Sequence, residues 1–257
     1  MTFCDIGVNL TNKRFHQDLN GVLAEARLAG VDTIIITGTN EQESAAALAL
    51  TENTTLTLYS TAGVHPHDAD AVSDDWLEHL RTLLASPQVV AVGECGLDFN
   101  RNYSSQSGQR AVFAAQLQLA KDYGKPVFLH ERDAFEEQIA LLQRYQIDHG
   151  VAHCFTGNAR QMQTYLSLGL YIGITGWVCD PKRGIDLQNA VAELPMDRLL
   201  LETDAPYLLP KTLPNKVRRN EPKFLPVVAQ TVAEIKGVTI EDVAQASYEN
   251  AQQLFAI

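Results

Sequence analysis

Short apolar runs alternate with amphipathic helical patterns eight times along this chain of 257 residues. The runs are typical of buried strands and span residues 3–8, 33–37, 56–62, 89–92, 127–129, 150–152, 170–174 and 198–201. Strict alternation of strands and helices predicts a parallel sheet, and eight units of about 32 residues each predict that the sheet closes on itself. We therefore expect an α/β protein, a single (β/α)8 TIM barrel that forms one domain over residues 1–257.

The composition, with 46% hydrophobic and 20% charged residues, is typical of a globular protein. No apolar run approaches the roughly 20 residues that span a bilayer, and the chain does not open on a basic region followed by an apolar stretch. The four cysteines lie far apart and form no Cys-x-x-Cys pair, which is typical of free thiols in a reducing compartment. We therefore expect a cytoplasmic protein without a membrane segment.

A net charge of −11 argues against a protein that binds duplex DNA through its phosphate backbone. One segment is nevertheless basic, and only Glu221 opposes its positive charges in the sequence. Its basic residues are Lys211, Lys216, Arg218, Arg219 and Lys223. Net charge describes long-range steering rather than the field inside a cleft, so a local site for an anion stays open.

Four predicted strands lead into residues that can bind a metal ion. Glu94 follows the run 89–92, where we expect the strand to end because the flanking glycines allow a sharp turn. His130 and His153 end the next two strands, and Asp204 follows the last. The carboxyl ends of barrel strands meet at one mouth, where active sites lie. Two histidines with carboxylates and an open position are typical of a hydrolytic metal site.

Each candidate ligand also has a structural alternative. Glu94 could form an ion pair with Arg132, and a buried histidine is more often a hydrogen-bonded core residue. Asp204 could cap the turn before Pro206, while Glu202, two residues earlier on the same strand face, could enter the site in its place. The agreement among four strand ends favours the metal site.

Other polar and aromatic residues are less specific signals. His65 and His67 share one face across Pro66 and could contact a substrate or pack a loop. Trp177 and Tyr207 could stack on a nucleobase, although aromatic residues near a barrel rim more often serve packing. Two helix starts are also readable, because Asp133 with Glu136 forms a capping-box pattern and Thr239 precedes the last helix.

Several of these motifs together resemble those of the TatD family of metal-dependent deoxyribonucleases. They include Gly-Glu-x-Gly-Leu-Asp at 93–98, His-x-Arg-Asp-Ala at 130–134, His-Cys-Phe-Thr-Gly at 153–157 and Glu-Thr-Asp-Ala-Pro-Tyr at 202–207. The resemblance runs nearly end to end and is greatest to the bacterial TatD branch. It implies a barrel of the metal-dependent hydrolase type and Mg²⁺-dependent exonuclease activity. It also implies 3′-to-5′ digestion of single strands in DNA repair or turnover.

This chain departs from the family pattern at the end of the first strand. Many relatives carry His-x-His there, where this chain has Gly7 and Asn9. We expect the metal site of Glu94, His130 and His153 to survive this change. A second ion could bind between Glu94 and Asp204, with Asn9 as a weak oxygen ligand. A histidine-rich set would suit Mn²⁺ or Zn²⁺ by ligand softness, whereas the resemblance implies Mg²⁺.

The mechanism that we expect is metal-assisted hydrolysis of a phosphodiester, with Glu94 and Asp204 as catalytic residues and Asp204 as the base that orients or deprotonates a water. Arg132 and His65 are the expected contacts of the phosphate, because a guanidinium matches two phosphate oxygens. Arg218 and Arg219 of the basic segment would hold the following nucleotides of single-stranded DNA or RNA. No obligate protein partner is evident.

Two other functions stay open at this point. The same barrel and ligands would serve a hydrolase of amides, lactones or an aminoacyl ester of tRNA, because the fold does not determine the substrate. Alternatively, the loss of two histidines at positions 7 and 9 could leave a catalytically weak scaffold protein.

Overall fold

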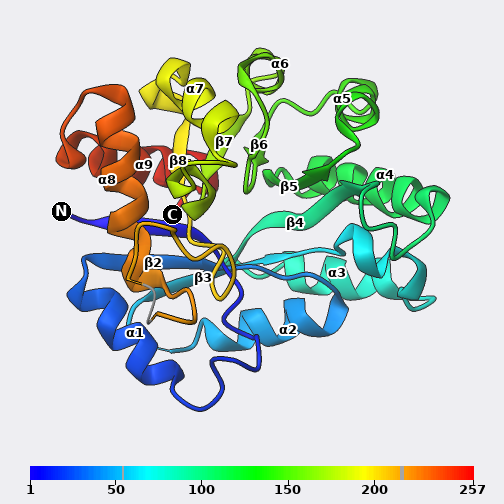
Figure 1. Cartoon of the computed structure of the whole chain (residues 1–257). Coiled ribbons are helices and arrows are strands. Elements are labelled where there is room, and N and C mark those ends of the chain that lie inside the picture. Colours follow the sequence, from blue (N-terminus) through cyan, green and yellow to red (C-terminus); the bar gives the residue numbers. More distant parts are fainter. Residues whose placement is uncertain (54, 215–216) are drawn as a thin grey trace.

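The structure is a computed structural model that describes residues 1–53, 55–214 and 217–257. Within these residues, eight parallel strands pair in chain order to form a nearly closed barrel, with helices outside it (Figure 1). The strands are β1 (Phe3–Val8), β2 (Val31–Ile36), β3 (Thr57–Ala62), β4 (Val89–Asp98), β5 (Val127–Arg132), β6 (Gly150–Ala152), β7 (Tyr171–Ile174) and β8 (Leu199–Leu201). The predicted TIM barrel is therefore confirmed, whereas the extent of the domain stays a prediction.

At least one helix follows each strand, as the alternating pattern predicts. They are α1 (Leu19–Leu28), α2 (Glu41–Leu50), α3 (Trp76–Leu84), α4 (Gln106–Tyr123), α5 (Phe135–Arg144), α6 (Ala159–Ser167), α7 (Ile185–Glu193), α8 (Leu225–Lys236) and α9 (Ile240–Phe255). Thr239 caps α9 as predicted, in a capping box with Asp242. No helix of the described residues is long and apolar enough to cross a membrane.

The barrel is closed between its first and last strands by a short contact instead of a full ladder. Val8 forms an isolated parallel bridge with Ala205, just beyond the end of β8. The amide of Asp204 donates to the Gly7 carbonyl at 2.9 Å, and the amide of Asn9 donates to Ala205 at 2.8 Å. The segment that follows β8 is therefore fixed against the end of β1, which brings residues 7–9 and 204 together.

Apolar side chains form two separate layers. The larger cluster lies between the strands and the surrounding helices. The smaller cluster fills the barrel interior, where Cys4, Phe128 and Leu200 pack with Leu254 and Phe255 of α9. Asn250 of α9 also donates to the carbonyls of Met196 and Leu199, at the start of β8. Helix α9 therefore closes the amino end of the barrel and leaves the carboxyl end open.

The strand that carries Glu94 is longer than predicted. We expected it to end at Glu94, but β4 continues to Asp98 and pairs with β5 as far as Arg132. The expected turn is instead an irregularity in register between Gly93 and Cys95. A Cβ at Gly93 or Gly96 would collide with backbone oxygens of β5, so these glycines allow a close approach of the two strands.

The capping box predicted at Asp133 is also wrong. Helix α5 begins at Phe135, so Glu136 lies one position too early to complete the motif, and its N-cap Ala134 has no side-chain cap. The Ala134 amide donates instead to Glu131 at 2.8 Å, and Asp133 accepts from the Asn100 side chain at 2.7 Å. The Ala134 amide and the Asp133 carboxylate therefore find their hydrogen-bond partners in Glu131 and Asn100 instead of in a capping box. A capping motif read from the sequence alone does not reveal such partners.

Candidate metal centre and substrate cavity

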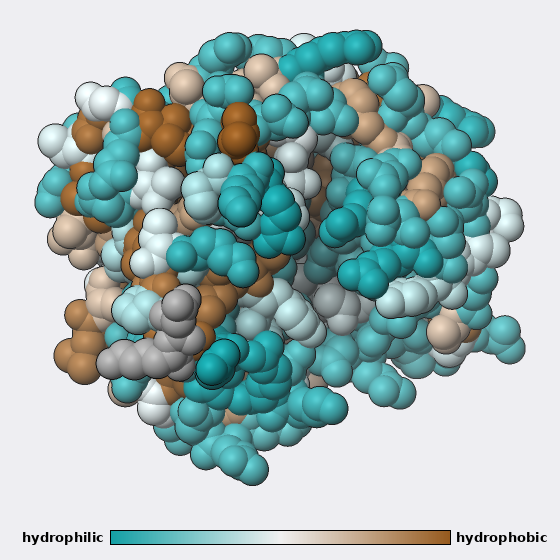
Figure 2. Space-filling view, in the orientation of Figure 1, coloured by the Kyte–Doolittle hydropathy of each residue, from teal (hydrophilic) through white to brown (hydrophobic). Residues whose placement is uncertain are grey.

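A cavity of about 930 Å³ opens at the carboxyl end of the barrel. It is lined by residues that follow or end seven of the strands, most of them polar. Figure 2 shows the face that carries the hollow, with hydrophilic residues around it. Its volume lies at the upper end of the range for ligand pockets, so it is large enough to bind more than a single ion.

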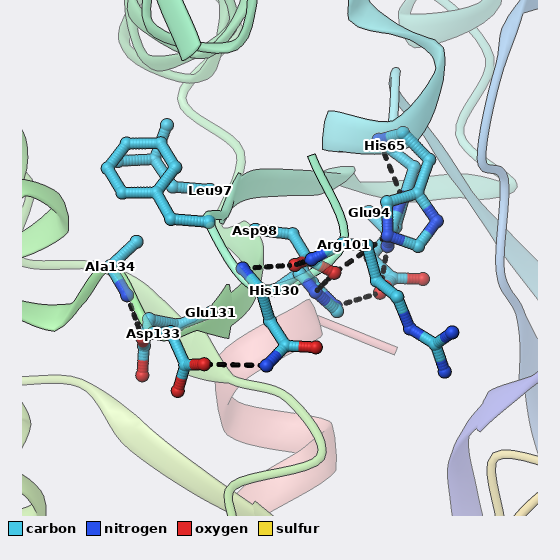
Figure 3. A network of polar contacts seen from close by, with 12 residues as sticks. His65, Glu94, Leu97, Asp98, Arg101, His130, Glu131, Asp133 and Ala134 are labelled. Atoms are coloured by element: carbon cyan, nitrogen blue, oxygen red, sulfur yellow. Dashed lines mark hydrogen bonds and ion pairs between the residues drawn. The ribbon is translucent and has the colours of Figure 1, made fainter. Parts of the chain in front are cut away.

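Glu94 is a buried residue that lines this cavity and contacts three histidines. One of its carboxylate oxygens, Oε1, is 2.9 Å from His130 Nδ1, 3.4 Å from His65 Nε2 and 3.6 Å from His153 Nε2. Figure 3 shows His65 and His130 converging on Glu94 from neighbouring strands. The structure therefore brings together Glu94, His130 and His153, which were selected from the sequence, and adds His65. Their roles stay predictions.

The donor set fits a divalent cation. Ligand atoms of His65, Glu94 and His130 lie within 4.8 Å of one another, and so do those of His153, Cys154 and Asp204. His130 Nε2 is buried without a hydrogen-bond partner, which is unusual for a polar atom. Imidazole nitrogens and carboxylate oxygens are ligands of Mg²⁺, Mn²⁺ and Zn²⁺ sites in different proportions. These residues are thus candidate metal-binding groups, and the set does not select one ion.

A third group of potential ligands lies outside the cavity. Glu41, Asp75 and His79 come within the same distance of one another, but His79 and Asp75 are exposed. Ser73 donates to Glu41 and Asp75, and His79 contacts both carboxylates, so the group is an ordinary polar cluster between α2 and α3.

Asp204 lies on the β8 side of the cavity and is held by Asn9. The Asn9 side-chain amide donates to Asp204 Oδ1 at 2.9 Å and also to the Ala205 carbonyl at 3.4 Å. This role differs from the weak oxygen ligand expected from the sequence, because the amide presents its nitrogen to the carboxylate. Asn9 therefore orients Asp204 toward the cavity, which both residues line.

Glu202 supports the site from beneath instead of lining the cavity. Its carboxylate contacts His153 Nδ1 at 2.5 Å and accepts from the Cys154 amide at 2.5 Å. A Cβ at Gly7 would collide with this carboxylate, so the absence of a side chain at position 7 leaves the space that Glu202 fills. Glu202 thereby turns Nε2 of His153 toward Glu94, as a partner of a metal-binding histidine commonly does.

Asp98 is a site residue that our sequence analysis missed. It is buried at the end of β4, and its Oδ2 lies 2.7 Å from His67 Nε2 and 3.5 Å from His130 Nε2. Its Oδ1 accepts from the amide of Arg101 (Figure 3). It also accepts from the amide of Asn100. Asp98 lies four positions after Glu94, an even spacing that places both on one face of a regular strand. Our sequence analysis ended this strand at Glu94, so it could not place Asp98 on the same strand face.

The charges of the cluster balance one another. Burial alone would raise the pKa of Glu94, but His65, His153 and His130 outweigh it and hold this pKa well below its ordinary value. Burial opposes protonation of the histidines, yet their carboxylate partners raise the pKa of His130 to about 9 and that of His153 to about 10. Protons on these histidines therefore compensate the carboxylates, and a divalent cation would replace them.

Asp204 titrates differently from Glu94. Burial is the largest influence and, together with Glu94 and Glu202, raises its pKa to about 7, although His153 opposes the shift. A carboxyl group with this pKa in a cavity can accept or release a proton near neutral pH.

Two cations of the basic segment, Arg219 and Lys223, also have acidic partners from outside the segment, in addition to Glu221. Arg219 contacts Asp18 at 2.7 Å and Glu221 at 2.9 Å, and its guanidinium lies over the Phe15 ring. Lys223 contacts Glu25 and Glu221. The acidic partners come from residues 18–25, about 200 positions away in sequence, and only folding reveals them.

Of the four residues predicted to contact phosphates, two line the cavity and two do not. Arg132 is exposed and lines the cavity with His65, whereas Arg218 and Arg219 lie outside its lining. Lys216 falls outside the described residues.

Only one of the two aromatic candidates lies at the cavity. Tyr207 lines it, and its hydroxyl accepts from the Asn12 side chain at 2.9 Å. Trp177 is outside the lining. Its indole donates to the Arg183 carbonyl at 3.2 Å, and the Arg183 guanidinium covers its ring at 4.5 Å. The structure thus gives Trp177 a packing role, which our sequence analysis had regarded as the more common one.

A (β/α)8 barrel with histidines and carboxylates at its carboxyl mouth defines a hydrolase of the metal-dependent class. The sequence model of the family described as "TatD related DNase" matches residues 4–256. The chain therefore belongs to the TatD related DNase family, which confirms the resemblance found in its motifs.

Individual relatives agree with this assignment. The chain is 51% identical over 257 residues to the "3′-5′ ssDNA/RNA exonuclease TatD" of Edwardsiella piscicida, covering 98% of this chain and 99% of the relative. It is 49% identical to the protein of the same name from Rahnella sp. (strain Y9602), covering 98% of each. Among solved structures, a TatD homologue from Escherichia coli K12 is 33% identical with a TM-score of 0.92, over 99% of this chain and 98% of that one.

Proposed function

We propose that this protein is a metal-dependent exonuclease that hydrolyses phosphodiester bonds from the 3′ end of single-stranded DNA or RNA. The observation that carries the proposal is the convergence of three histidines on one oxygen of Glu94, inside a large polar cavity. The activity in the names of relatives that are about half identical to this chain supports it.

Glu94, His130 and His153 would hold the divalent cation, and His65 lies beside this set. We propose Mg²⁺ as the ion, with Mn²⁺ and Zn²⁺ as alternatives because imidazole is softer than an oxygen ligand. When bound, such an ion polarises a phosphate oxygen and makes a coordinated water more acidic. Glu94 is essential in this scheme because one of its carboxylate oxygens contacts all three histidines.

Asp204 would act as the general base. Its carboxylate lines the cavity, its pKa is raised by burial to about 7, and Asn9 restrains its orientation. In the hydrolysis, the water oxygen forms a bond to phosphorus as a water proton passes to Asp204. The bond between phosphorus and the leaving nucleoside oxygen then breaks, and that oxygen takes up a proton.

Arg132 and His65 would contact the phosphate. Both line the cavity, and the exposed guanidinium of Arg132 can donate two parallel hydrogen bonds to phosphate oxygens. Arg218 is exposed outside the lining, and Arg219 already has two carboxylate partners, so we assign neither of them to the reacting phosphate.

We further propose that the protein acts in the cytoplasm, in DNA repair or turnover, without an obligate protein partner. All four cysteines, Cys4, Cys95, Cys154 and Cys179, are free thiols, which supports a reducing compartment.

The experiment that tests this function uses single-stranded DNA labelled at either end. The wild type should shorten 5′-labelled strands progressively with Mg²⁺ or Mn²⁺ and release a labelled mononucleotide at once from 3′-labelled strands. Chelator and Glu94→Ala should both abolish cleavage. Glu193→Ala, which changes an exposed glutamate outside the cavity lining, is the control and should leave cleavage unchanged. Cleavage by Glu94→Ala at the wild-type rate would contradict the proposed site, and progressive shortening of 3′-labelled strands would contradict the direction.

A further inference from the structure

Two exposed aromatic residues stand at the mouth of the cavity. Among the described residues, the large apolar side chains that are exposed are Met1, Leu28, Tyr103, Ile185, Tyr207 and Val238. Only Tyr103, which is 67% exposed, and Tyr207, which is 49% exposed, are aromatic, and both line the cavity. Aromatic rings are usually buried because of their large apolar surface, so two exposed rings at one cavity indicate a ligand with flat apolar faces.

The two rings come from opposite sides of the barrel. Tyr103 lies in the loop between β4 and α4, and Tyr207 follows β8. Strands four positions apart in a barrel of eight lie across from each other. The tyrosines therefore flank the metal-binding cluster from two sides instead of forming one patch.

The Tyr103 loop is held rigidly beneath its ring. The hydroxyl of the next residue, Ser104, donates to the His67 carbonyl at 2.8 Å and accepts from the Asp70 amide at 3.1 Å. Gln109, which is buried, donates to the Ser104 carbonyl at 3.0 Å. The Tyr103 ring itself stands edge-on to the imidazole of His67, with 4.7 Å between centroids. Little conformational entropy would therefore be lost when a ligand stacks on it.

Tyr207 is restrained in a comparable way. The Tyr207 amide donates to the Asp204 carbonyl at 3.0 Å, and the Asn220 side chain donates to the Tyr207 carbonyl at 2.7 Å. The hydrogen bond from Asn12 to its hydroxyl fixes the outer end of the ring. Both tyrosines thus combine a restrained backbone with an exposed face.

Cationic side chains accompany the rings. Lys13, Arg101 and Arg132 line the same cavity, and none of them forms an ion pair within the described part of the chain, in contrast to Arg219 and Lys223. Figure 3 shows the Arg101 side chain turned away from Asp98 and His130. Unpaired cations beside exposed aromatic rings match a ligand that alternates phosphates with bases.

We propose that Tyr103 and Tyr207 form an aromatic pair that stacks on the bases of a single nucleic-acid strand, while Arg101 and Lys13 contact its phosphates. This inference rests on the proposed nuclease function and names the residues that recognise the strand. Stacking needs an accessible base face, which a duplex keeps covered, and every base offers such a face. The pair thereby explains a preference for single strands without a preference for sequence, on a protein whose net charge is −11.

The test measures binding of a fluorescent single-stranded 12-mer by anisotropy in the presence of chelator, which separates binding from cleavage. Tyr103→Ala should weaken binding by about 5- to 150-fold, the range that corresponds to the loss of one stacked base from its aromatic partner. Tyr103→Phe should bind like the wild type, because stacking needs the ring and not the hydroxyl. Leu28→Ala, which removes an exposed apolar side chain outside the cavity, is the control and should change nothing.

A second arm places one abasic nucleotide at each position from the 3′ end. Wild-type affinity should fall at the position that stacks on Tyr103, and the same abasic strand should bind Tyr103→Ala no more weakly than the intact strand does. If the wild type binds the strand and Tyr103→Ala binds it equally well, the aromatic pair is wrong while the nuclease function stands. If the wild type neither binds nor cleaves single strands, the nuclease function fails first.

Discussion

The two ends of the barrel are built from the same strands but have opposite chemistry. At the amino end, Leu254 and Phe255 of α9 pack into an apolar interior with Cys4 and Leu200. At the carboxyl end, the strands lead into carboxylates and histidines that surround an open cavity. The two regions meet where the Phe128 ring lies against the imidazole of His153, with 4.5 Å between the ring centroids.

This difference shows how a barrel can hold an unfavourable cluster of charges. Burying carboxylates and histidines costs free energy, and the ion pairs among Glu94, His130 and His153 offset that cost only while all partners are present. The closed apolar end supplies stability independently of the cluster. We therefore expect changes at the carboxyl end to alter chemistry and changes at the amino end to alter stability.

The largest effect is expected from Asp204→Asn. Asparagine keeps the shape of the side chain but cannot accept a proton, so cleavage of single-stranded DNA should fall by about 10²- to 10⁴-fold. Metal affinity should be largely retained, because Glu94, His130 and His153 are unchanged. The measurement pairs single-turnover cleavage with metal titration, and near wild-type cleavage would remove Asp204 from its role as the base.

The opposite outcome is expected at the amino end from Leu254→Ala. Leu254 is 2% exposed in the barrel interior, and truncating such a side chain leaves a cavity that costs roughly 2–5 kcal/mol of unfolding free energy. Cleavage per folded molecule at 25 °C should stay close to that of the wild type. Urea unfolding and cleavage assays on the same preparation decide this, and a stable but inactive protein would show that the two ends are coupled.

A finer comparison within the carboxyl end separates Arg132 from Arg219. Arg132→Ala should raise the KM for single-stranded DNA about 10-fold or more, because charge-assisted hydrogen bonds to phosphate are lost. Arg219→Ala should leave KM nearly unchanged and lower stability instead, since its guanidinium serves Asp18, Glu221 and the Phe15 ring. Equal increases in KM for both variants would restore the basic segment as a substrate contact.

The smallest effect concerns the pH dependence of stability in chelator. The folded protein keeps a proton on Asp204 up to about pH 7, whereas an ordinary aspartate of the unfolded chain, with a pKa of 3.8, releases it earlier. Stability should therefore fall as pH rises through this window, by at most about 1.4 kcal/mol per pH unit from this group. Asp204→Asn should show a flatter dependence between pH 5 and 7, and identical slopes for the two proteins would argue against a raised pKa.

The arrangement of the barrel and the location of its site could be predicted from sequence for one reason. In a parallel barrel, the carboxyl ends of all strands meet whatever the details of pairing, so Glu94, His130, His153 and Asp204 had to converge if the strands were assigned correctly. An error of a few residues in a strand end, as at β4, does not change that conclusion.

The supporting contacts could not be predicted in the same way. Asp18 and Glu25 pair with Arg219 and Lys223 only because residues 18–25, at and within the start of α1, lie against the basic segment in the fold. Glu202 reaches His153 only because Gly7 leaves room. Each of these depends on residues from distant parts of the chain meeting at atomic distances, which periodicity and local motifs do not encode.

The most direct test of the central claim is a calorimetric titration of Mn²⁺ into chelator-treated protein. Wild type should bind the ion stoichiometrically and Glu94→Ala should lose this binding, because the carboxylate oxygen shared by the three histidines is gone. His79→Ala, which disrupts the remote cluster with Glu41 and Asp75, should titrate like the wild type. Unchanged Mn²⁺ binding by Glu94→Ala would contradict a metal centre at the mouth of this barrel.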